Sequence, residues 1–473
     1  MRYWNRTKII ATIGPASSSP LIMEKLILRG MDIARINLSH GKANQQINLI
    51  RELRRVAEKL NSPLGILVDV PGPKLRLGPL EKKVVLLKKG SQLTFTSKKI
   101  LGNEEKLSLN YPEVLKGVRK GSFIYINDGL IKLRVLRVKD KEVDCLVENS
   151  GEIMPGKGVN IPEIVLDDYI KEERNNKKII FASSLNPDFL ALSFVKNGED
   201  VAKVRSILRR EGKNIFLIAK IEKKEAIRNI DSLIEESDGI MVARGDLGIE
   251  TSLEKLPLLQ KEIIEKCNLK GKPVIVATQI LSSMVSSPLP TRAEVTDIAN
   301  AIFDGADCLM LSEETAIGKY PVEAVSTLYK VSLITEKKFP YLKYLTQRIE
   351  KDISILEAVS YSAVWTSYKL EAKAIVVPTY TGETARWVSK FRPKSPIFAL
   401  TPSKSVLRKL NIFWGVYAIL FPLKMSLEKL PLSLDSLFKK LKILRSKTKI
   451  IITGSNPMGK EGKTNLIQIH QLK

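Results

Sequence analysis

Short runs of apolar, mostly branched residues alternate with amphipathic segments over the first 340 residues of the chain. Each run has the length of a buried strand, and most runs are separated by a segment long enough for a helix. Alternating strands and helices predict a parallel sheet with helices packed on it. The predicted strands are Lys8–Ile13, Asp32–Leu38, Leu64–Val70, Phe189–Val195, Asn214–Ile221, Gly239–Ala243, Pro273–Thr278 and Asp307–Leu311.

Eight such strand–helix units in a core of about 250 residues predict an α/β fold, a closed (β/α)₈ TIM barrel. We assign this catalytic domain to residues 1–72 and 162–340. The alternative is an open, doubly wound sheet, which a glycine-rich dinucleotide fingerprint would favour. No such fingerprint follows a predicted strand in this sequence.

The connection between the third and fourth strands is too long for a single helix and has a different texture. Short alternating runs separated by turn residues predict a small inserted β-barrel domain at residues 73–161, a lid at the strand end where active sites open. Its predicted strands are Lys83–Leu87, Gln92–Ser97, Ser122–Ile126, Leu130–Val138 and Glu142–Glu148.

The pattern changes again after about Glu336, and we expect a separate α/β domain at residues 341–473. Ile353–Tyr368 has the spacing of a helix. The predicted strands of this domain are Ala374–Pro378, Pro396–Thr401, Val416–Phe421 and Lys449–Thr453.

The segment from Leu217 to Glu250 carries charges where a core strand should be apolar. Strand side chains alternate with period 2, so Lys220 and Glu222 share one face of the fifth strand. An amphipathic helix is predicted at Lys224–Glu235, and Asp246 then lies in a glycine-flanked turn after the sixth strand. An ammonium and two carboxylates on neighbouring parallel strands predict a site for a divalent metal and a phosphate.

Active-site residues of a barrel come from the carboxyl ends of different strands, so we expect the site at these ends. Converging Arg and Lys side chains suit a phosphoryl group, and hard cations such as Mg²⁺ take carboxylate oxygens. The scarcity of His argues against zinc hydrolysis. The polar residues at these ends are Thr12, Arg35, Asn37, Ser39, His40, Asp69, Lys74, Arg76, Lys220, Glu222, Arg244, Asp246, Thr278, Gln279, Ser312, Glu313, Glu314 and Thr315.

Each of these residues, taken singly, also has a purely structural interpretation. Lys220 with Glu222 could be a surface ion pair, Asp246 a turn former, and Arg35 a partner of Asp32. Thr278 could be a core hydroxyl with a local partner. Their joint occurrence at successive strand ends favours a functional site.

Composition adds little that is specific. Lys and Arg number 77 against 51 Asp and Glu, a net charge of +26, which suits either anionic metabolites or nucleic acid. The basic residues are scattered and form no arm, so we expect no specific nucleic-acid partner. The three separated cysteines suggest a reducing compartment, and no apolar run reaches the roughly 20 residues of a membrane span. We read no signal peptide at the N-terminus and expect no membrane partner and a cytoplasmic location.

Six segments of the sequence closely resemble the pyruvate kinase family. They are ARINLSHG (Ala34–Gly41), GPKLRLG (Gly72–Gly78), IAKIE (Ile218–Glu222), DGIMVARGDLGIE (Asp238–Glu250), GKPVIVATQ (Gly271–Gln279) and PTRAEVTDIANAIFDGADCLMLSEETAIGKYPVEAV (Pro290–Val325). The resemblance runs from Arg6 to the C-terminus. It implies a barrel, an inserted lid and a C-terminal effector domain, in a homotetramer. It also implies transfer of a phosphoryl group from phosphoenolpyruvate to ADP, giving pyruvate and ATP, the last step of glycolysis.

The resemblance further implies roles for the reacting groups. Glu222 and Asp246 would bind the Mg²⁺ or Mn²⁺ that bridges phosphoenolpyruvate. Lys220 would neutralise charge on the phosphoryl group in flight, and Arg35 would hold the phosphate. The substrate carboxylate would lie against Thr278 and the backbone of Ala243, Gly245 and Asp246. Thr278 would also lie on the proton path to the enolpyruvate carbon, with Ser312 as a further relay.

A second cation pocket is implied at Asn37, Ser39 and Asp69. ADP and its phosphates would be bound from the barrel and from the lid. The implied nucleotide residues are Thr12, Pro15, Asn37, His40, Arg76, Asp128 and Lys157.

Two positions depart from the pattern of the family. Lys74 and Val70 stand where potassium-dependent members have Glu and Thr, and an ammonium there could supply the charge of the potassium ion. We therefore expect activity without K⁺. Glu313 adds a carboxylate, since Leu311–Thr315 reads LSEET where many members read LSGET, which leaves the proton route open.

The C-terminal loop Gly454–Lys460 follows a predicted strand and almost reads as a P-loop, but Glu461 follows its lysine and no helix is evident. The resemblance implies instead an effector pocket that takes a sugar phosphate or AMP. A plain turn with solvated lysines is the alternative. The effector residues would be Thr379, Thr381, Gly382, Thr384, Gly459 and Lys460.

Two other functions stay open from the sequence. A Mg²⁺-dependent pyruvate or phosphoenolpyruvate lyase or mutase would share the carboxylate pair but lack the lid and the nucleotide contacts. A basic nucleic-acid-binding protein would show salt-dependent affinity for DNA or RNA.

Overall fold

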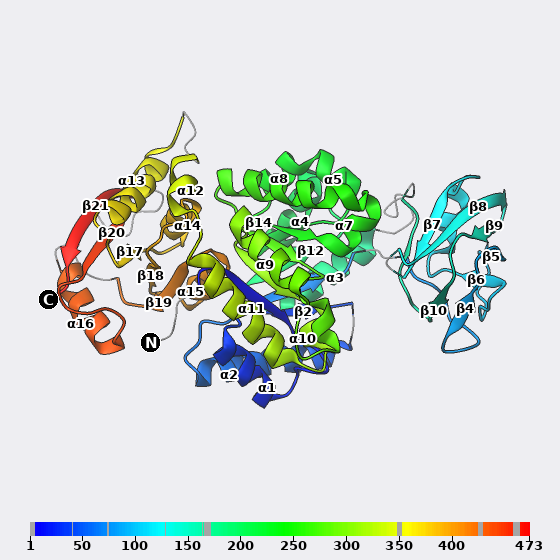
Figure 1. The fold of residues 1–473 in the computed structure, drawn as a ribbon, viewed down its shortest axis with the longest axis horizontal. Coiled ribbons are helices and arrows are strands. Elements are labelled where there is room, and N and C mark those ends of the chain that lie inside the picture. Colours follow the sequence, from blue (N-terminus) through cyan, green and yellow to red (C-terminus); the bar gives the residue numbers. More distant parts are fainter. Residues whose placement is uncertain are drawn as a thin grey trace.

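The computed structural model describes residues 5–39, 41–72, 75–127, 129–162, 164, 172–347, 352–423, 429–456 and 464–473, without the side chains of residues 172–175. Three parts follow one another along the long axis of the molecule (Figure 1). A barrel lies in the middle, a small all-β part lies at one end, and an α/β part that holds the C-terminus lies at the other.

The central part is the predicted closed barrel. Its parallel strands follow the order β1-β16-β15-β14-β13-β12-β3-β2, and β1 pairs with both β2 and β16. Every strand expected from the first 340 residues forms, and the fold class is confirmed. The strands are β1 (Lys8–Thr12), β2 (Ile33–Asn37), β3 (Gly65–Val70), β12 (Phe189–Leu192), β13 (Phe216–Ile221), β14 (Gly239–Ala243), β15 (Val274–Ala277) and β16 (Cys308–Leu311).

Helices cover the outside of the barrel. Within the described ranges, no helix combines the length and the apolar character that crossing a membrane requires. The main helices of this layer are α1 (Pro20–Arg29), α2 (Ala43–Lys59), α3 (Glu172–Ser184), α4 (Gly198–Arg210), α8 (Leu256–Leu269), α9 (Arg292–Asp304) and α11 (Pro321–Glu336).

The alternation of strand side chains separates two apolar cores. Ile9 and Ala11 of β1 pack outward with the helices, whereas Ile10 packs into the barrel interior. The interior core continues without a break into the C-terminal part, because Phe216 contacts both Phe189 and Phe413, with ring centroids 5.4 and 6.2 Å apart. Apolar side chains therefore fill the amino end of the barrel, and the carboxyl end remains for polar groups.

A buried ion pair also joins the barrel to the C-terminal part. Arg392 is 2 % exposed, and its guanidinium donates to Asp307 at 2.9 Å and to the side chain of Asn268 at 2.6 Å. Its Cζ atom lies 5.3 Å from the centre of the Trp414 ring. Because a buried charge is costly unless it is paired, these contacts specify how the two parts meet.

One predicted helix is wrong in its continuity. Lys224–Glu235 was expected to be a single helix, but the structure has α5 (Lys224–Arg228) and α6 (Ile230–Glu236). The break falls at Asn229, whose backbone leaves the helical region and whose side-chain amide donates to the carbonyl of Lys196 at 3.1 Å. Asn competes in this way for backbone groups outside its own helix.

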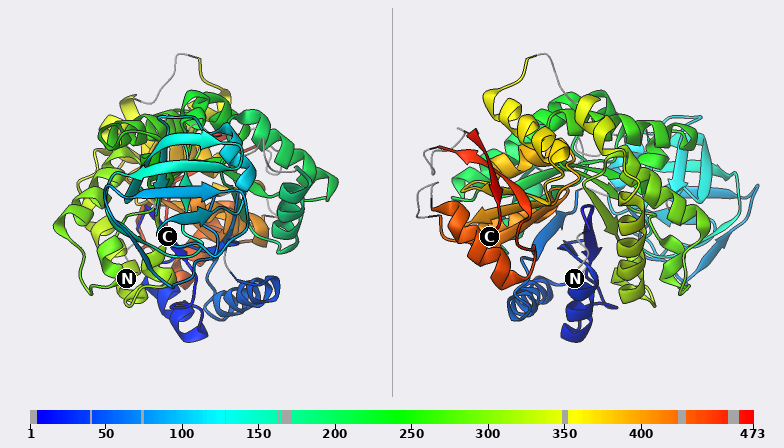
Figure 2. Two further views of the ribbon diagram at one scale, coloured as in Figure 1. Left: turned by 90° about the vertical axis from the view of Figure 1, so that its right-hand side faces the viewer. Right: turned by 60° about the vertical axis from the view of Figure 1, so that its left-hand side comes forward.

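The all-β part has its own buried core and curls over the carboxyl end of the barrel, as Figure 2 shows from the side of this part. Its main sheet has the order β11-β7-β8-β9-β5-β6, and β10 pairs with β4. The strands β6 (Lys106–Ser108), β10 (Gly151–Ile153) and β11 (Val159–Asn160) are too short for their alternation to be recognised. The others, all predicted, are β4 (Val85–Leu87), β5 (Gln92–Thr96), β7 (Phe123–Ile126), β8 (Ile131–Lys139) and β9 (Glu142–Val147).

The C-terminal part is a sheet of order β19-β18-β17-β20-β21 with helices packed on it. The expected strands form as β17 (Ala374–Pro378), β18 (Ile397–Thr401), β19 (Val416–Leu420) and β20 (Lys449–Ser455). The antiparallel edge strand β21 (Thr464–Gln471) was not predicted, because it is rich in polar residues. The α-helices among the described residues of this part are α12 (Tyr341–Gln347), α13 (Ile355–Lys369), α14 (Glu383–Lys390), α15 (Lys404–Lys409) and α16 (Leu430–Leu441).

Candidate active site

Lys220 lies at the centre of the carboxyl end of the barrel. It belongs to β13, and its side chain is 11 % exposed. Three oxygens of the described residues surround its Nζ atom: Glu222 Oε1 at 2.8 Å, Ser193 Oγ at 2.9 Å and Asp69 Oδ1 at 3.2 Å. The interpretation of Lys220 and Glu222 as a surface ion pair is therefore wrong, since both groups are buried.

Asp69 joins this ammonium to a second cation. Its Oδ2 atom accepts from Nε and NH2 of Arg35 at 3.0 and 2.7 Å, so Arg35 does not pair with Asp32. Burial acts to raise the pKa of Asp69, but Lys220 and Arg35 outweigh it and hold that pKa below the ordinary value. Burial acts to lower the pKa of Lys220, yet Asp69 and Glu222 raise it, so the ammonium stays charged.

The surroundings of the Glu222 carboxylate disfavour its negative charge. It is 2 % exposed, and its Oε2 atom accepts a hydrogen bond from the backbone N–H of Phe194 at 2.8 Å. Burial raises its pKa, Lys220 opposes this rise, and the nearby Asp246 adds to it. A cation between Glu222 and Asp246 would relieve this repulsion, which is the electrostatic setting of a metal site.

Asp246 and Thr278 meet where β14 and β15 end. The short helix α7 (Arg244–Glu250) begins directly after β14, and the amide of Gly245 donates to Thr278 Oγ1 at 2.9 Å. Thr278 and Gln279 have φ values of 65° and 54°, a left-handed conformation that is strained for these residues. Such strain is typical of a loop shaped for function.

Arg244 does not belong to the converging cations expected from its position. Its guanidinium donates to the carbonyls of Thr278 and Gln279 at 2.8 and 2.9 Å and pairs with Asp297 at 2.7 Å. The N–H groups of the guanidinium are therefore directed at these nearby acceptors. Arg244 therefore braces the Thr278 turn and does not face the Lys220 cluster.

The two adjacent glutamates that follow β16 have different environments. Glu314 is buried and accepts from the amides of Leu281 at 3.0 Å and Ser312 at 2.7 Å. Glu313, the departure from the family pattern, is exposed. Ser312 Oγ is buried and has no hydrogen-bond partner among the described residues. The extra carboxylate thus lies outside the buried pocket of the Ser312 hydroxyl.

The residues expected around the nucleotide come from several strand ends and from the lid. Thr12 donates to the carbonyl of Leu311 at 2.8 Å and accepts from Arg35 at 2.9 Å, so its hydroxyl serves Arg35. Asn37 Oδ1 accepts from the amide of Ser39 at 3.0 Å. Pro15 is exposed near the same end of the barrel. His40, Lys74 and Asp128 lie outside the described residues.

Arg76 and Lys157 lie together at the base of the lid. Arg76 NH1 donates to the carbonyl of Gly156 at 2.8 Å, and the amide of Leu77 donates to the carbonyl of Lys157 at 2.9 Å. These antiparallel contacts hold the two connections of the lid against each other. Both side chains are therefore carried by the part that covers the site.

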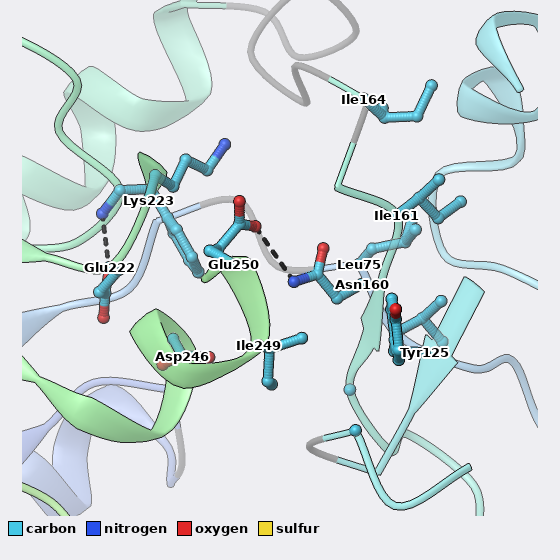
Figure 3. A pocket seen from close by; sticks show the side chains of 14 residues that line it. Leu75, Tyr125, Asn160, Ile161, Ile164, Glu222, Lys223, Asp246, Ile249 and Glu250 are labelled. Atoms are coloured by element: carbon cyan, nitrogen blue, oxygen red, sulfur yellow. Dashed lines mark hydrogen bonds between the residues drawn. The ribbon is translucent and has the colours of Figure 1, made fainter. Parts of the chain in front are cut away.

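A cleft lies between the lid and the barrel. Figure 3 shows Glu222 and Asp246 on its barrel side and Tyr125 and Ile161 on its lid side. Asn160 of the lid donates to Glu250 at the end of α7 at 3.1 Å, across the cleft. The candidate metal carboxylates thus open onto a space that the lid closes.

Ser193 and Phe194 are site residues that the sequence analysis missed. They directly follow β12, which contributed no residue to the predicted set. The signal available in the sequence was a hydroxyl immediately after an apolar strand. Ser193 Oγ lies between Lys220 and Asp69, and Phe194 holds Glu222.

The predicted effector residues Thr379, Thr381, Gly382 and Thr384 lie in the turn after β17 and at the start of α14. Thr379 Oγ1 accepts from the amide of Gly382 at 2.8 Å, and Thr381 Oγ1 accepts from that of Glu383 at 3.4 Å. The hydroxyls of Thr384 and Thr464 lie 2.7 Å apart. Gly459 and Lys460 lie outside the described residues.

A buried ammonium and guanidinium beside two carboxylates, at the carboxyl end of a lidded barrel, are typical of a phosphotransferase. The family descriptions "Pyruvate kinase, barrel domain" and "Pyruvate kinase, alpha/beta domain" match residues 4–325 and 357–470. The chain belongs to the pyruvate kinase family, and the expected enzyme class, a phosphotransferase with pyruvate kinase activity, is confirmed.

Individual relatives cover nearly the whole chain. It is 44% identical to a pyruvate kinase of Thermotoga maritima over 469 residues, which are 98% of each chain. It is 42% identical to that of Thermococcus litoralis over 473 residues, which are 99% of each chain. A crystal structure of a pyruvate kinase from Cryptosporidium parvum matches with a TM-score of 0.90 and 38% identity, covering 99% of this chain and 96% of that one.

The ion pairs of Asp69 predict how stability depends on pH. We expect Asp69→Asn to lower the free energy of unfolding by about 3–5 kcal/mol at pH 7, since it leaves two buried cations with one charged partner fewer. Because the folded-state pKa of Asp69 lies below its ordinary value of 3.8, the carboxylate stabilises the fold above that pH. The difference between the proteins should shrink only as the pH falls below about 4.

Urea unfolding at a series of pH values measures this difference. Asp231→Asn is the control, because the side chain of Asp231 is 79% exposed and pairs with a surface lysine. It should unfold like the wild type. A difference that vanished already at neutral pH would contradict the assigned charge of Asp69.

Proposed function

We propose that the enzyme transfers the phosphoryl group of phosphoenolpyruvate to ADP at the carboxyl end of the barrel, giving pyruvate and ATP. The observation that carries this proposal is the Lys220 ammonium, buried and fully charged beside Asp69 and Glu222. Phosphoryl transfer relies on positioning and on electrostatic stabilisation, and this ammonium supplies both.

We assign the substrate phosphate to Lys220 and Arg35. Asp69 accepts hydrogen bonds from both cations and offsets their mutual repulsion, so both can face the phosphate. A phosphoryl oxygen that bound Lys220 would have to replace one of its present acceptors, because an ammonium has three donors.

We assign the substrate carboxylate to the start of α7 and to Thr278. The amide of Gly245 meets the Thr278 hydroxyl there, and the amides of Ala243 and Asp246 belong to the same short segment. The Gly245 amide now donates to Thr278, so an arriving carboxylate would take over this donor. The Thr278 hydroxyl itself donates to the carbonyl of Ala277 at 2.6 Å, so it would have to turn away from that acceptor to move a proton.

Glu222 and Asp246 fit a hard divalent cation, Mg²⁺ or Mn²⁺, which would supply charge neutralisation when bound. Both line the cleft, and burial together with the negative charge of Asp246 raises the pKa of Glu222. No cluster of three or more His, Cys, Asp and Glu ligands occurs in the described part of the chain. Substrate and water oxygens would therefore complete the coordination of the cation.

Ser312 and Thr278 are our candidates for moving the proton to the enolpyruvate carbon. A buried hydroxyl is usually hydrogen-bonded, yet Ser312 Oγ has no partner within the described ranges. A water or substrate group would satisfy it. The exposed Glu313 does not enter this relay.

The nucleotide would lie between the barrel and the lid. Arg76 and Lys157 come from the base of the lid and would approach the phosphates, while Pro15, Asn37 and His40 would contact ADP from the barrel. Thr12 would act through Arg35, whose guanidinium it accepts from.

Replacement of Lys220 tests the proposal. In a coupled assay of pyruvate formed from phosphoenolpyruvate, ADP and Mg²⁺, Lys220→Met should lower turnover by at least about 10³-fold. Omission of Mg²⁺ should abolish the wild-type reaction. Lys266→Met, which removes a surface lysine bonded to Asp231, should behave like the wild type. Near-normal turnover of a folded Lys220→Met enzyme would refute the role of this residue.

We further propose that activity does not require K⁺. Both oxygens of Asp69 in the second cation pocket already accept from Arg35, Lys220 and Ser193, and the adjacent Val70 offers no side-chain oxygen. Turnover in buffer free of K⁺ and Na⁺ should therefore equal turnover with K⁺. The double substitution Val70→Thr, Lys74→Glu should create a K⁺ requirement. A strong K⁺ requirement of the wild type would contradict the proposal.

We infer a phosphorylated effector, a sugar phosphate or AMP, at the C-terminal part. Gly454 packs against Pro378, so the loop after β20 starts beside the Thr379–Thr384 turn with its hydroxyls and amides. Addition of sugar phosphates or AMP should shift the dependence of the rate on phosphoenolpyruvate, and Thr384→Val should weaken that shift. If no such compound shifts the wild-type response, the turn is only structural.

Exposed apolar groups support a homotetramer. Leu253, Leu258 and Leu289 are 72%, 68% and 72% exposed, and β21 leaves a strand edge with Ile469 56% exposed. Sedimentation velocity should show a particle of four chains of 53.0 kDa. A single-chain particle at micromolar concentration would contradict it. The free, buried cysteines accord with a cytoplasmic location.

A further inference from the structure

The turn after β12 supplies two contacts to the reacting groups from two consecutive residues. Ser193 Oγ accepts from Lys220 Nζ at 2.9 Å and donates to Asp69 Oδ1 at 3.3 Å. The amide of Phe194 donates to Glu222 Oε2 at 2.8 Å. One turn therefore touches the ammonium and the carboxylate that face each other at 2.8 Å.

We propose that Ser193 and Phe194 are positioning residues, which fix the Lys220 ammonium and the Glu222 carboxylate relative to each other for phosphoryl transfer and metal binding. This inference rests on the roles proposed above for Lys220 and Glu222. Among the strands of the barrel, β12 is the one at whose end no site residue was predicted, and the proposal gives this end a function.

Ser193 orients the ammonium without changing the charge of the cluster. The cations Lys220 and Arg35 are balanced by Asp69 and Glu222, all four of them buried. A carboxylate in place of Ser193 would upset this balance, whereas an apolar side chain would leave one ammonium proton without its acceptor. A neutral hydroxyl directs the third N–H bond of the ammonium and avoids both.

Phe194 presents its amide to Glu222 in a backbone conformation that is unfavourable for this residue. Its φ value is 59°, in the left-handed region that aromatic residues rarely adopt. Its ring packs where the chain leaves for the lid: a Cβ atom on Gly72 would lie 2.5 Å from Phe194 Cδ2. Lys223 Nζ lies 5.5 Å from the centre of the ring on the cleft side. The packing of the ring thus keeps the Phe194 amide directed at Glu222.

Steady-state kinetics test Ser193. We expect Ser193→Ala to lower kcat by about 10- to 100-fold, the usual effect of removing a group that orients a functional side chain, with a smaller change in KM for phosphoenolpyruvate. Ser193→Thr keeps the hydroxyl and should restore most of the rate. Ser183→Ala is the matched control, because it removes a buried hydroxyl bonded to Ile180 on α3 of the same barrel. Wild-type kcat in Ser193→Ala would overturn the proposal for Ser193.

Metal binding without substrates tests Phe194. Mn²⁺ titration followed by electron paramagnetic resonance should show a dissociation constant about 10- to 100-fold higher in Phe194→Gly than in the wild type. This substitution removes the packed ring and gives the backbone more conformational freedom. Phe194→Leu keeps the apolar bulk and should bind nearly as the wild type does. Equal Mn²⁺ affinity of folded Phe194→Gly and wild type would overturn the proposal for Phe194.

Two further variants separate this inference from the proposed function. Lys220→Met should lose turnover and Glu222→Gln should lose Mn²⁺ binding whatever Ser193 and Phe194 do. If these two variants fail as expected while Ser193→Ala and Phe194→Gly remain normal, only the positioning role is wrong. If Lys220→Met and Glu222→Gln remain normal, the proposed function of the site is wrong as well.

Discussion

The structure of the site depends on one buried set of charges, in which Asp69 joins Arg35 to Lys220 and Lys220 joins Asp69 to Glu222. Burying any one of these charges alone would cost free energy, and its partners offset that cost. The set is therefore specified as a whole, and its geometry follows from the parallel register that brings β2, β3, β12 and β13 side by side. The set places the buried cations Arg35 and Lys220 beside Glu222, one of the two candidate metal carboxylates.

The rest of the molecule leaves one end of the barrel available for this set. The apolar interior continues through Phe189, Phe216 and Phe413 into the C-terminal part, and Arg392 fixes that junction through Asp307. The amino end is thereby filled. The lid covers the opposite end, and its Asn160 contacts Glu250 on the helix that carries Asp246. A change in lid position would therefore act on a short helix that bears a candidate metal ligand.

The sequence alone predicts most of the barrel, because fully buried strands such as Gly239–Ala243 read as continuous apolar runs. It does not predict the shortest lid strands or β21, whose alternation is brief or masked by polar residues. Asn229 ends α5 through a bond to Lys196 that no local pattern reveals.

The candidate site shows the same division. Lys220 and Glu222 stand out because charges are unusual at a strand end, and the structure brings them together with Asp69. Arg244 has the same sequence signature but turns to Asp297, and Ser193 and Phe194 act through a hydroxyl and a backbone amide. Residue type and strand position identify a candidate, but side-chain direction depends on partners far apart in the chain.

The central claim is that the buried Lys220 ammonium stabilises the phosphoryl group during its transfer. A rapid-quench, single-turnover measurement of ATP formed from bound phosphoenolpyruvate and ADP isolates that step from substrate binding and product release. In Lys220→Gln the transfer rate should fall by at least about 10³-fold while phosphoenolpyruvate still binds. A transfer rate equal to that of the wild type would contradict the account.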